Sequence, residues 1–169
     1  MSVTLTRRTG VLELPAGQVR AALGELLGEP GAGQTLRRAG LLDAAGEPDP
    51  ALLLVRRVIA DPGSGRLTLA SEDRTMHGRI SEQHSVVVTP SDAAERARVV
   101  PMPTNFLPKC VLRAVGLLSA GSTREPRSPL LWTFSTSSGV HEGDRDFMRV
   151  VDDGRACQSL DPADRKSVV

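Results

Sequence analysis

Two segments decide the fold: LRRAGLLDAAGEPDPALLLVRRVIADP, residues 36–62, and PMPTNFLPKCVLRAVGLL, residues 101–118, with strand-like runs between them. In order, they predict a helix, an acidic turn, a helix that begins at Asp49-Pro50, a set of antiparallel strands and a helix that covers those strands. This order is typical of a scaffold that presents a sheet. Nothing in it is typical of a catalytic centre, so the pattern favours binding over chemistry.

The central helix has a strong start signal. Asp49 can cap the first turn, and Pro50 stands where no amide donor is needed. The helix is expected to run to about Ala60 and to be apolar nearly all round, apart from Arg56 and Arg57. Such a helix is usually central in its domain rather than peripheral.

An earlier helix is predicted after Pro15, and Gly28, Pro30, Gly31 and Gly33 end it. Its apolar residues share one face at helical spacing: Val19, Ala22, Leu23, Leu26 and Leu27. Thr35 is expected to cap a second, short helix that ends at Gly40.

Alternating apolar and polar residues predict strands at 3–5, 11–14 and 67–70, a run of valines predicts one at 85–89, and further strands are expected at 76–80 and 98–102. Pro101 and Pro103 place the last of these at a sheet edge or at its own end. Asn105 is expected to cap the covering helix. A second set of strands is predicted at 130–136, 147–151 and 156–160, with turns at 139–143 and 152–154.

The two sets of strands predict an α+β fold of two quasi-repeated units, each an antiparallel meander with helices. The first unit covers about 1–120 and the second about 128–163, within one domain over 1–163. No helix follows the second meander, so the second unit is expected to be incomplete.

The last six residues, DRKSVV at 164–169, match what a widely used sequencing adapter encodes in one reading frame. We therefore expect 164–169 to be a non-native tail from adapter read-through, and the natural protein to continue past about Ala163. The missing helix of the second unit favours the same interpretation. The other interpretation is a genuine short polar tail or a weak C-terminal carboxylate ligand.

Composition excludes several function classes. Aromatic residues make up 2% of the chain, too few for the stacking platforms that bind single-stranded nucleic acid. The net charge is +1 with no basic patch, which disfavours duplex binding. No apolar run approaches the length of a membrane span, and residues 1–17 contain no apolar signal core. These features predict a cytoplasmic protein with no nucleic-acid partner and no membrane insertion.

Catalytic and metal sites are also not predicted. His77 and His84 are seven residues apart and have no cysteine or paired carboxylate at a ligand spacing. No GxSxG nucleophile turn and no complete phosphate-binding loop occur. We therefore expect no enzyme activity, no cofactor and no metal.

The whole pattern resembles the EspG family of chaperones associated with type VII (ESX) secretion in actinobacteria. The resemblance spans nearly all of the chain. It lies in the order of the predicted elements and in their general residue pattern, without a diagnostic short motif. It is carried by AGLLD at 39–43, Gly46, the helix at 50–60 with Asp61-Pro62, the strands from Arg66, RVVPMP at 98–103 leading into an apolar helix, LWT at 131–133 and RVVDDGR at 149–155. It implies two quasi-equivalent halves and a cytosolic chaperone that binds secreted helical-hairpin proteins before their export, without catalysis.

The partner-binding residues are expected in the segment 72–84, which is polar, weakly patterned and long for a strand connection. They are Glu72, Arg74, His77, Arg79, Glu82 and His84.

Two alternatives remain open. One is an enzyme or small-molecule-binding protein with a pocket between sheet and helices, using His77, His84 and Arg79. The other is a structural adaptor that dimerises through a sheet edge. The sequence specifies neither the partner nor the oligomeric state.

Overall fold

The computed structural model describes residues 2–70, 75–91, 95–107, 131–136 and 139–143. The chain divides into two compact units, 1–62 with 86–101 and 63–85 with 102–169. Antiparallel strands and helices occur together, which confirms the predicted α+β class. The predicted repetition of the two units stays a prediction.

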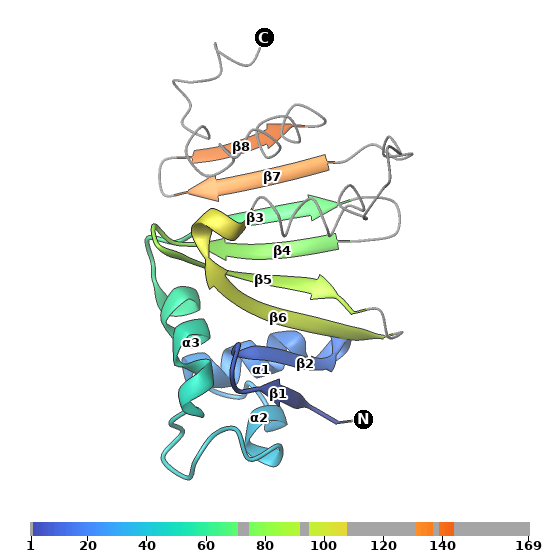
Figure 1. The fold of residues 1–169 in the computed structure, drawn as a ribbon, viewed down its shortest axis with the longest axis vertical. Helices are drawn as coiled ribbons and strands as arrows, with labels where there is room; N and C mark the ends of the chain where they lie inside the picture. Colours follow the sequence, from blue (N-terminus) through green and yellow to red (C-terminus); the bar gives the residue numbers. More distant parts are fainter. Residues whose placement is uncertain (1, 71–74, 92–94, 108–130, 137–138, 144–169) are drawn as a thin grey trace. The chain divides into compact units, whose positions relative to one another are not determined.

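In the first unit the strands lie in the order β1-β2-β6-β5 (Figure 1). They are β1 (Thr4–Thr6), β2 (Val11–Pro15), β5 (His84–Pro90) and β6 (Arg96–Pro103). β2 pairs antiparallel with both β1 and β6, and Leu12 lies opposite Val99. The turn before β2 requires Gly10, because its φ is +69° and a Cβ there would lie 2.7 Å from the Ala51 carbonyl oxygen.

Helices α1 (Val19–Leu27) and α3 (Leu53–Ala60) pack with these strands. The 3-10 turns η1 (Ala16–Gln18) and η2 (Pro50–Leu52) lead into them, and the short helix α2 (Thr35–Arg38) lies between them in the chain. As the sequence predicts, the Asp49 carboxylate caps η2 by accepting from the Ala51 amide at 3.0 Å. Gly28 ends α1 in the left-handed conformation, with φ of 70°.

The core of the first unit is aliphatic. Each fully buried Leu or Val contributes about 1.5–3 kcal/mol to stability relative to an exposed one. The core residues come from both helices, α2, the adjoining loop and three strands: Leu12, Leu14, Ala22, Leu26, Leu36, Leu41, Leu42, Leu52, Val55, Val58, Ile59, Val86 and Val99.

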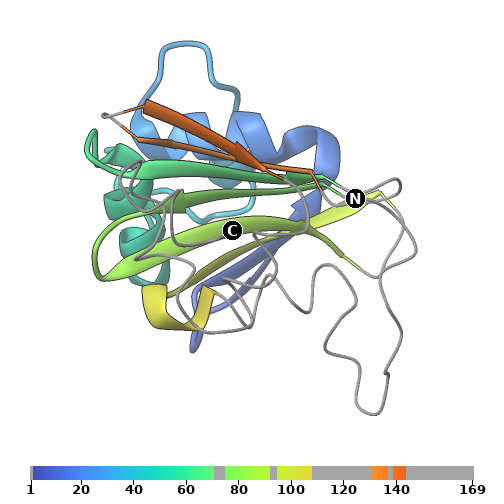
Figure 2. The same cartoon turned by 90° about the horizontal axis from the view of Figure 1, so that it is seen from above.

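In the second unit the strands lie in the order β4-β3-β7-β8. They are β3 (Gly65–Ala70), β4 (Thr75–Ile80), β7 (Leu131–Thr136) and β8 (Gly139–Gly143), each antiparallel to its neighbour. β3 and β4 run side by side in both views (Figures 1 and 2). The 3-10 turn η3 (Thr104–Phe106) also belongs to this unit.

Several local predictions are wrong at the helices. α3 is amphipathic rather than buried all round, because Leu53 is 46% exposed and Arg57 is exposed on its outer face. Leu27 is also exposed, because it is the last residue of α1 and Leu26 occupies the core position. Thr35 is the first residue of α2 and not its side-chain cap.

Predictions at the strands need similar correction. β6 lies between β2 and β5 in the strand order, so Pro101 and Pro103 mark its end and not an edge. Asn105 lies inside η3, whose cap position is Pro103. The turn predicted at 139–143 is strand β8, because the ladder to β7 provides partners that outweigh the low strand propensity of its glycines. The elements predicted at 108–118 and 147–160 lie outside the described residues.

Candidate partner-binding surface

The β3–β4 pair has one buried face and one polar face, because side chains alternate along a strand. Leu67 and Leu69 of β3 and Met76 of β4 are buried, with 3% exposure or less. The residues between them in sequence point to the opposite face. That polar face carries Arg66 and Thr68 from β3 and Thr75, His77 and Arg79 from β4.

Register brings the polar residues together in pairs. Arg66 lies directly opposite Arg79, and Thr68 lies directly opposite His77. The Thr68 hydroxyl is 3.3 Å from Nδ1 of His77. Arg79 Nη1 donates a hydrogen bond to the Ser64 carbonyl oxygen, with a donor–acceptor distance of 3.5 Å. Two cationic side chains and an imidazole therefore share one small area of sheet.

The turn after β4 is held by hydrogen bonds rather than left loose. Ser81 donates its amide to the His84 carbonyl oxygen at 2.9 Å and its hydroxyl to the same oxygen at 2.7 Å. Thr104 donates its hydroxyl to the Ser81 carbonyl oxygen and its amide to the Gln83 carbonyl oxygen, both at 2.9 Å. The turn is therefore tied to the start of η3.

A buried hydroxyl pair extends this network. Ser85, which is fully buried, has its Oγ 2.9 Å from Thr104 Oγ1. Because Thr104 uses its one hydroxyl proton toward Ser81, we infer that Ser85 is the donor of this pair. Every hydroxyl in the chain of contacts then has a partner, as buried polar groups require.

The site residues predicted from the sequence lie on different elements of the structure. His77 and Arg79 lie on the same polar face of β4, Glu82 is exposed in the following turn, and His84 begins β5. Glu72 and Arg74 lie outside the described residues. Where it is described, the segment is a regular strand and a short turn, not a long loop. His77 and Arg79 are therefore brought together.

Arg66 was missed by the sequence analysis. The alternation around Leu67 and Leu69 signals that it shares a face with Thr68. No local sequence pattern signals the strand register that places Arg66 opposite Arg79. No group of three or more His, Cys, Asp or Glu residues that could hold a metal occurs in the described part of the chain.

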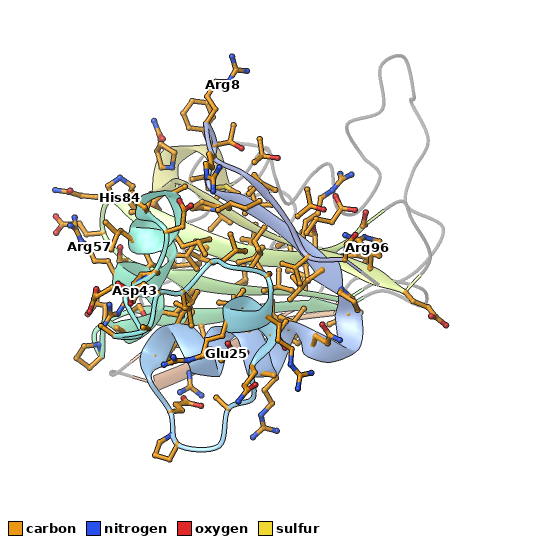
Figure 3. The ribbon with its side chains drawn as sticks, turned by 90° about the horizontal axis from the view of Figure 1, so that it is seen from below. Arg8, Glu25, Asp43, Arg57, His84 and Arg96 are labelled. Atoms are coloured by element: carbon orange, nitrogen blue, oxygen red, sulfur yellow. The ribbon has the colours of Figure 1, made fainter. Side chains whose placement is uncertain are left out.

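The first unit contains a buried carboxylate that sequence analysis also missed. Glu25 of α1 is 8% exposed, and its two oxygens accept the amides of Thr35, Leu36 and Arg37 at the start of α2. The Leu36 and Arg37 amides lie at 3.0 and 3.2 Å. Figure 3 shows Glu25 beside this short helix. A residue ten positions earlier therefore caps α2, in the role predicted for Thr35.

A second carboxylate joins β2 to β6. Glu13 lies opposite Arg98, and its oxygens accept from Arg96 Nε at 3.0 Å and Arg98 Nε at 3.3 Å. These hydrogen bonds, that of Arg96 first, lower the pKa of Glu13 below its usual value. Arg96 also donates to the Ser2 carbonyl oxygen at 3.0 Å. The network thereby connects the first residues of the chain to β6.

The acidic loop before α3 is held in the same way. Asp49 accepts from Arg7 Nε at 3.0 Å as well as from Ala51, and the Ala51 amide contributes most to lowering its pKa. Glu47 pairs with Arg56 Nη1 at 2.9 Å. Both contacts have exposed partners and stabilise the loop only modestly.

No protein-family model matches this chain, and no curated protein matches it. In the described residues, no helix is long and apolar enough to cross a membrane.

Proposed function

We propose that this protein is a cytosolic, non-catalytic chaperone of the EspG kind, which binds a helical-hairpin substrate of a type VII secretion system before export. The sequence resemblance supports the proposal, and so does the polar face of the β3–β4 pair. The single observation that carries it is the fixed position of exposed polar groups on that face, next to a turn held by Ser81 and Thr104.

The physical argument concerns preorganisation. A protein that recognises a partner with a strand face loses less conformational entropy than one that must order a loop. His77 and Arg79 present polar groups from a paired strand, and the proposed partner-binding surface includes them together with Glu82 of the turn and His84 at the start of β5. Glu72 and Arg74 complete the surface in this proposal.

The test is complex formation between the purified chain and helical-hairpin secretion substrates of actinobacteria. We expect a one-to-one complex in size-exclusion chromatography and a measurable heat of binding by calorimetry. Charge reversal by Arg74→Glu with Arg79→Glu should weaken that binding without changing the melting temperature. If none of the hairpin substrates forms a complex with the wild-type chain, the chaperone proposal is wrong.

Arg20→Glu with Arg38→Glu is a suitable control, because it changes the net charge by the same amount on exposed residues of the other unit. Equal weakening by this control would mean that net charge, and not the proposed surface, sets the affinity.

A further inference from the structure

We infer that two copies of this protein associate through the outer face of η2 and α3. Leu53 of one copy packs against Leu53 of the other, and Arg57 of each copy meets the acidic loop 43–49 of the other. The occupant of this face is therefore a second copy of the chain. The inference goes beyond the proposed function and uses no residue of the proposed partner-binding surface.

The first observation is an exposed stripe along η2 and α3. Pro50, Leu53, Arg57 and Ala60 follow one another at spacings of three and four residues, which places them on one side of a helix, and all four are exposed. Leu53 is 46% exposed although the rest of its helix supplies the core with Val55, Val58 and Ile59. The stripe therefore presents an aliphatic side chain and, one turn later, a guanidinium group.

The second observation is the charge beside this stripe. Arg56 of α3 pairs with Glu47 at 2.9 Å, so the loop 43–49 lies against the helix. Within the part of the chain that the structure describes, the Arg57 guanidinium has no carboxylate partner, and the Asp43 carboxylate accepts from the Glu47 amide at 2.8 Å without a cationic partner. The face thus carries one uncompensated charge of each sign.

The acidic loop is held in place before any association. The Asp43 amide donates to the Glu47 carbonyl oxygen at 2.9 Å, and the Gly46 amide donates to the Asp43 carbonyl oxygen at 3.1 Å. Gly46 has a φ of +86°, as this tight turn requires. Figure 3 shows Asp43 and Arg57 at one edge of the first unit and Arg8 at another. Little conformational entropy is therefore lost when the loop meets a partner.

Two-fold symmetry brings the two uncompensated charges together. In a two-fold pair the copies of α3 run antiparallel, so the direction toward the C-terminus of one helix is the direction toward the N-terminus of the other. Arg57 lies one turn after Leu53, about 6 Å along the axis, whereas the loop 43–49 precedes η2. With Leu53 at the two-fold axis, Arg57 of each copy therefore reaches the acidic loop of the other. A foreign acidic helix would satisfy Arg57 but leave Asp43 without a cation.

The experiment is sedimentation-velocity ultracentrifugation of the full chain at low salt, from about 5 to about 500 µM. We expect a reversible monomer–dimer equilibrium in the micromolar range, because the face is small for a stable dimer. Leu53→Glu should be monomeric at every concentration. Leu27→Glu, the same substitution at an exposed leucine of α1, is the matched control and should dimerise as wild type does. Unchanged melting temperatures show that both variants fold.

A charge exchange tests the ion pairs directly. Arg57→Glu and Asp43→Arg should each raise the Kd of the dimer at least about tenfold, since each places like charges together at two symmetric contacts. The double variant with both substitutions should return to within about threefold of wild type, because it restores the opposite-charge pairs with their positions exchanged.

Four outcomes would overturn the inference. They are a wild type that stays monomeric, equal loss of the dimer in Leu27→Glu, a double charge variant that associates no better than the single variants, and loss of a helical-hairpin substrate complex in Leu53→Glu while wild type is monomeric. The last outcome would assign this face to the substrate. A dimer that forms without any substrate complex supports the inference and rejects the chaperone, so the two proposals can fail separately.

Discussion

Two antiparallel pairs of strands in this molecule differ in the charges that their register sets opposite each other. On the β2–β6 pair, Glu13 lies opposite Arg98 and also contacts Arg96, so each cation meets an anion within the fold. On the β3–β4 pair, Arg66 lies opposite Arg79. Both pairs are antiparallel, and they differ in which side chains lie directly opposite each other.

The difference separates a structural charge network from a surface suited to binding. Glu13 holds three segments together, since Arg96 also reaches the Ser2 carbonyl oxygen. A like-charge pair cannot stabilise the sheet by itself. We therefore expect the β2–β6 network to contribute to stability, while recognition by the β3–β4 face belongs to the proposed function. The predictions that follow test this separation.

The largest expected effect tests whether the first unit tolerates a buried carboxylate without donors. Glu25 is buried and has three amide donors, whereas the fully buried Val55 has an aliphatic environment. Val55→Asp should cost about 4 kcal/mol or more and unfold the first unit, because it leaves an unpaired charge in the core. Thermal and urea unfolding measure this. Val55→Ala is the control at about 2 kcal/mol, and a melting temperature for Val55→Asp at or above that of Val55→Ala would contradict the assigned core.

The next prediction concerns the three amide donors at the start of α2 that hydrogen-bond to the Glu25 carboxylate. Glu25→Gln keeps the size of the side chain but leaves one acceptor oxygen and an NH2 group facing three amide donors, so the cap of α2 should weaken at a cost of about 1–3 kcal/mol. Hydrogen exchange should accelerate first at the amides of Thr35, Leu36 and Arg37. Glu29→Gln, an exposed neighbour in the same segment, should change little. Uniform acceleration through β2 and β6 would show that Glu25 acts on the whole unit and not on α2.

A smaller effect is expected on the pH dependence of the free energy of unfolding. Glu13 has a lowered pKa in the folded state, so its network stabilises the protein above the ordinary glutamate pKa. That stability should be lost as the pH falls from about 4.5 through the lower folded pKa. Unfolding in urea across pH 2 to 7 should show a shallower acid limb for Glu13→Gln than for wild type. An identical limb would mean that the ion pairs contribute nothing to stability, and Asp49 would then account for the acid sensitivity.

The smallest effect has the opposite sign. Arg66→Glu converts the like-charge pair on β3–β4 into an opposite-charge pair, in imitation of Glu13 and Arg98. It should raise stability by about 0.2–1 kcal/mol. Differential scanning calorimetry measures this change. A loss of stability would show that Arg66 is a structural residue, and the contrast between the two strand pairs would fail.

Predictions from the sequence succeeded where the signal was local. Asp49-Pro50 was expected to begin a helix, and the Asp49 carboxylate does accept the Ala51 amide two residues later. The alternation at 67–70 predicted β3, because side chains on a strand reverse face at every residue, and the run of valines at 85–89 predicted β5. The class, α+β, followed from these elements together.

Tertiary structure decided the rest, because the deciding contacts join residues far apart in the chain. Thr35 has the right chemistry for a cap, yet Glu25 occupies that role from α1, since its carboxylate reaches three amides at once. Strand β8 at Gly139–Gly143 exists because β7 supplies its hydrogen-bonding partners. The sequence alone determined which residues of β3 and β4 share a face. Only the register of the folded chain set Arg66 against Arg79, because pairing between strands depends on the turn and on the packing of the buried face, and not on the arginines themselves.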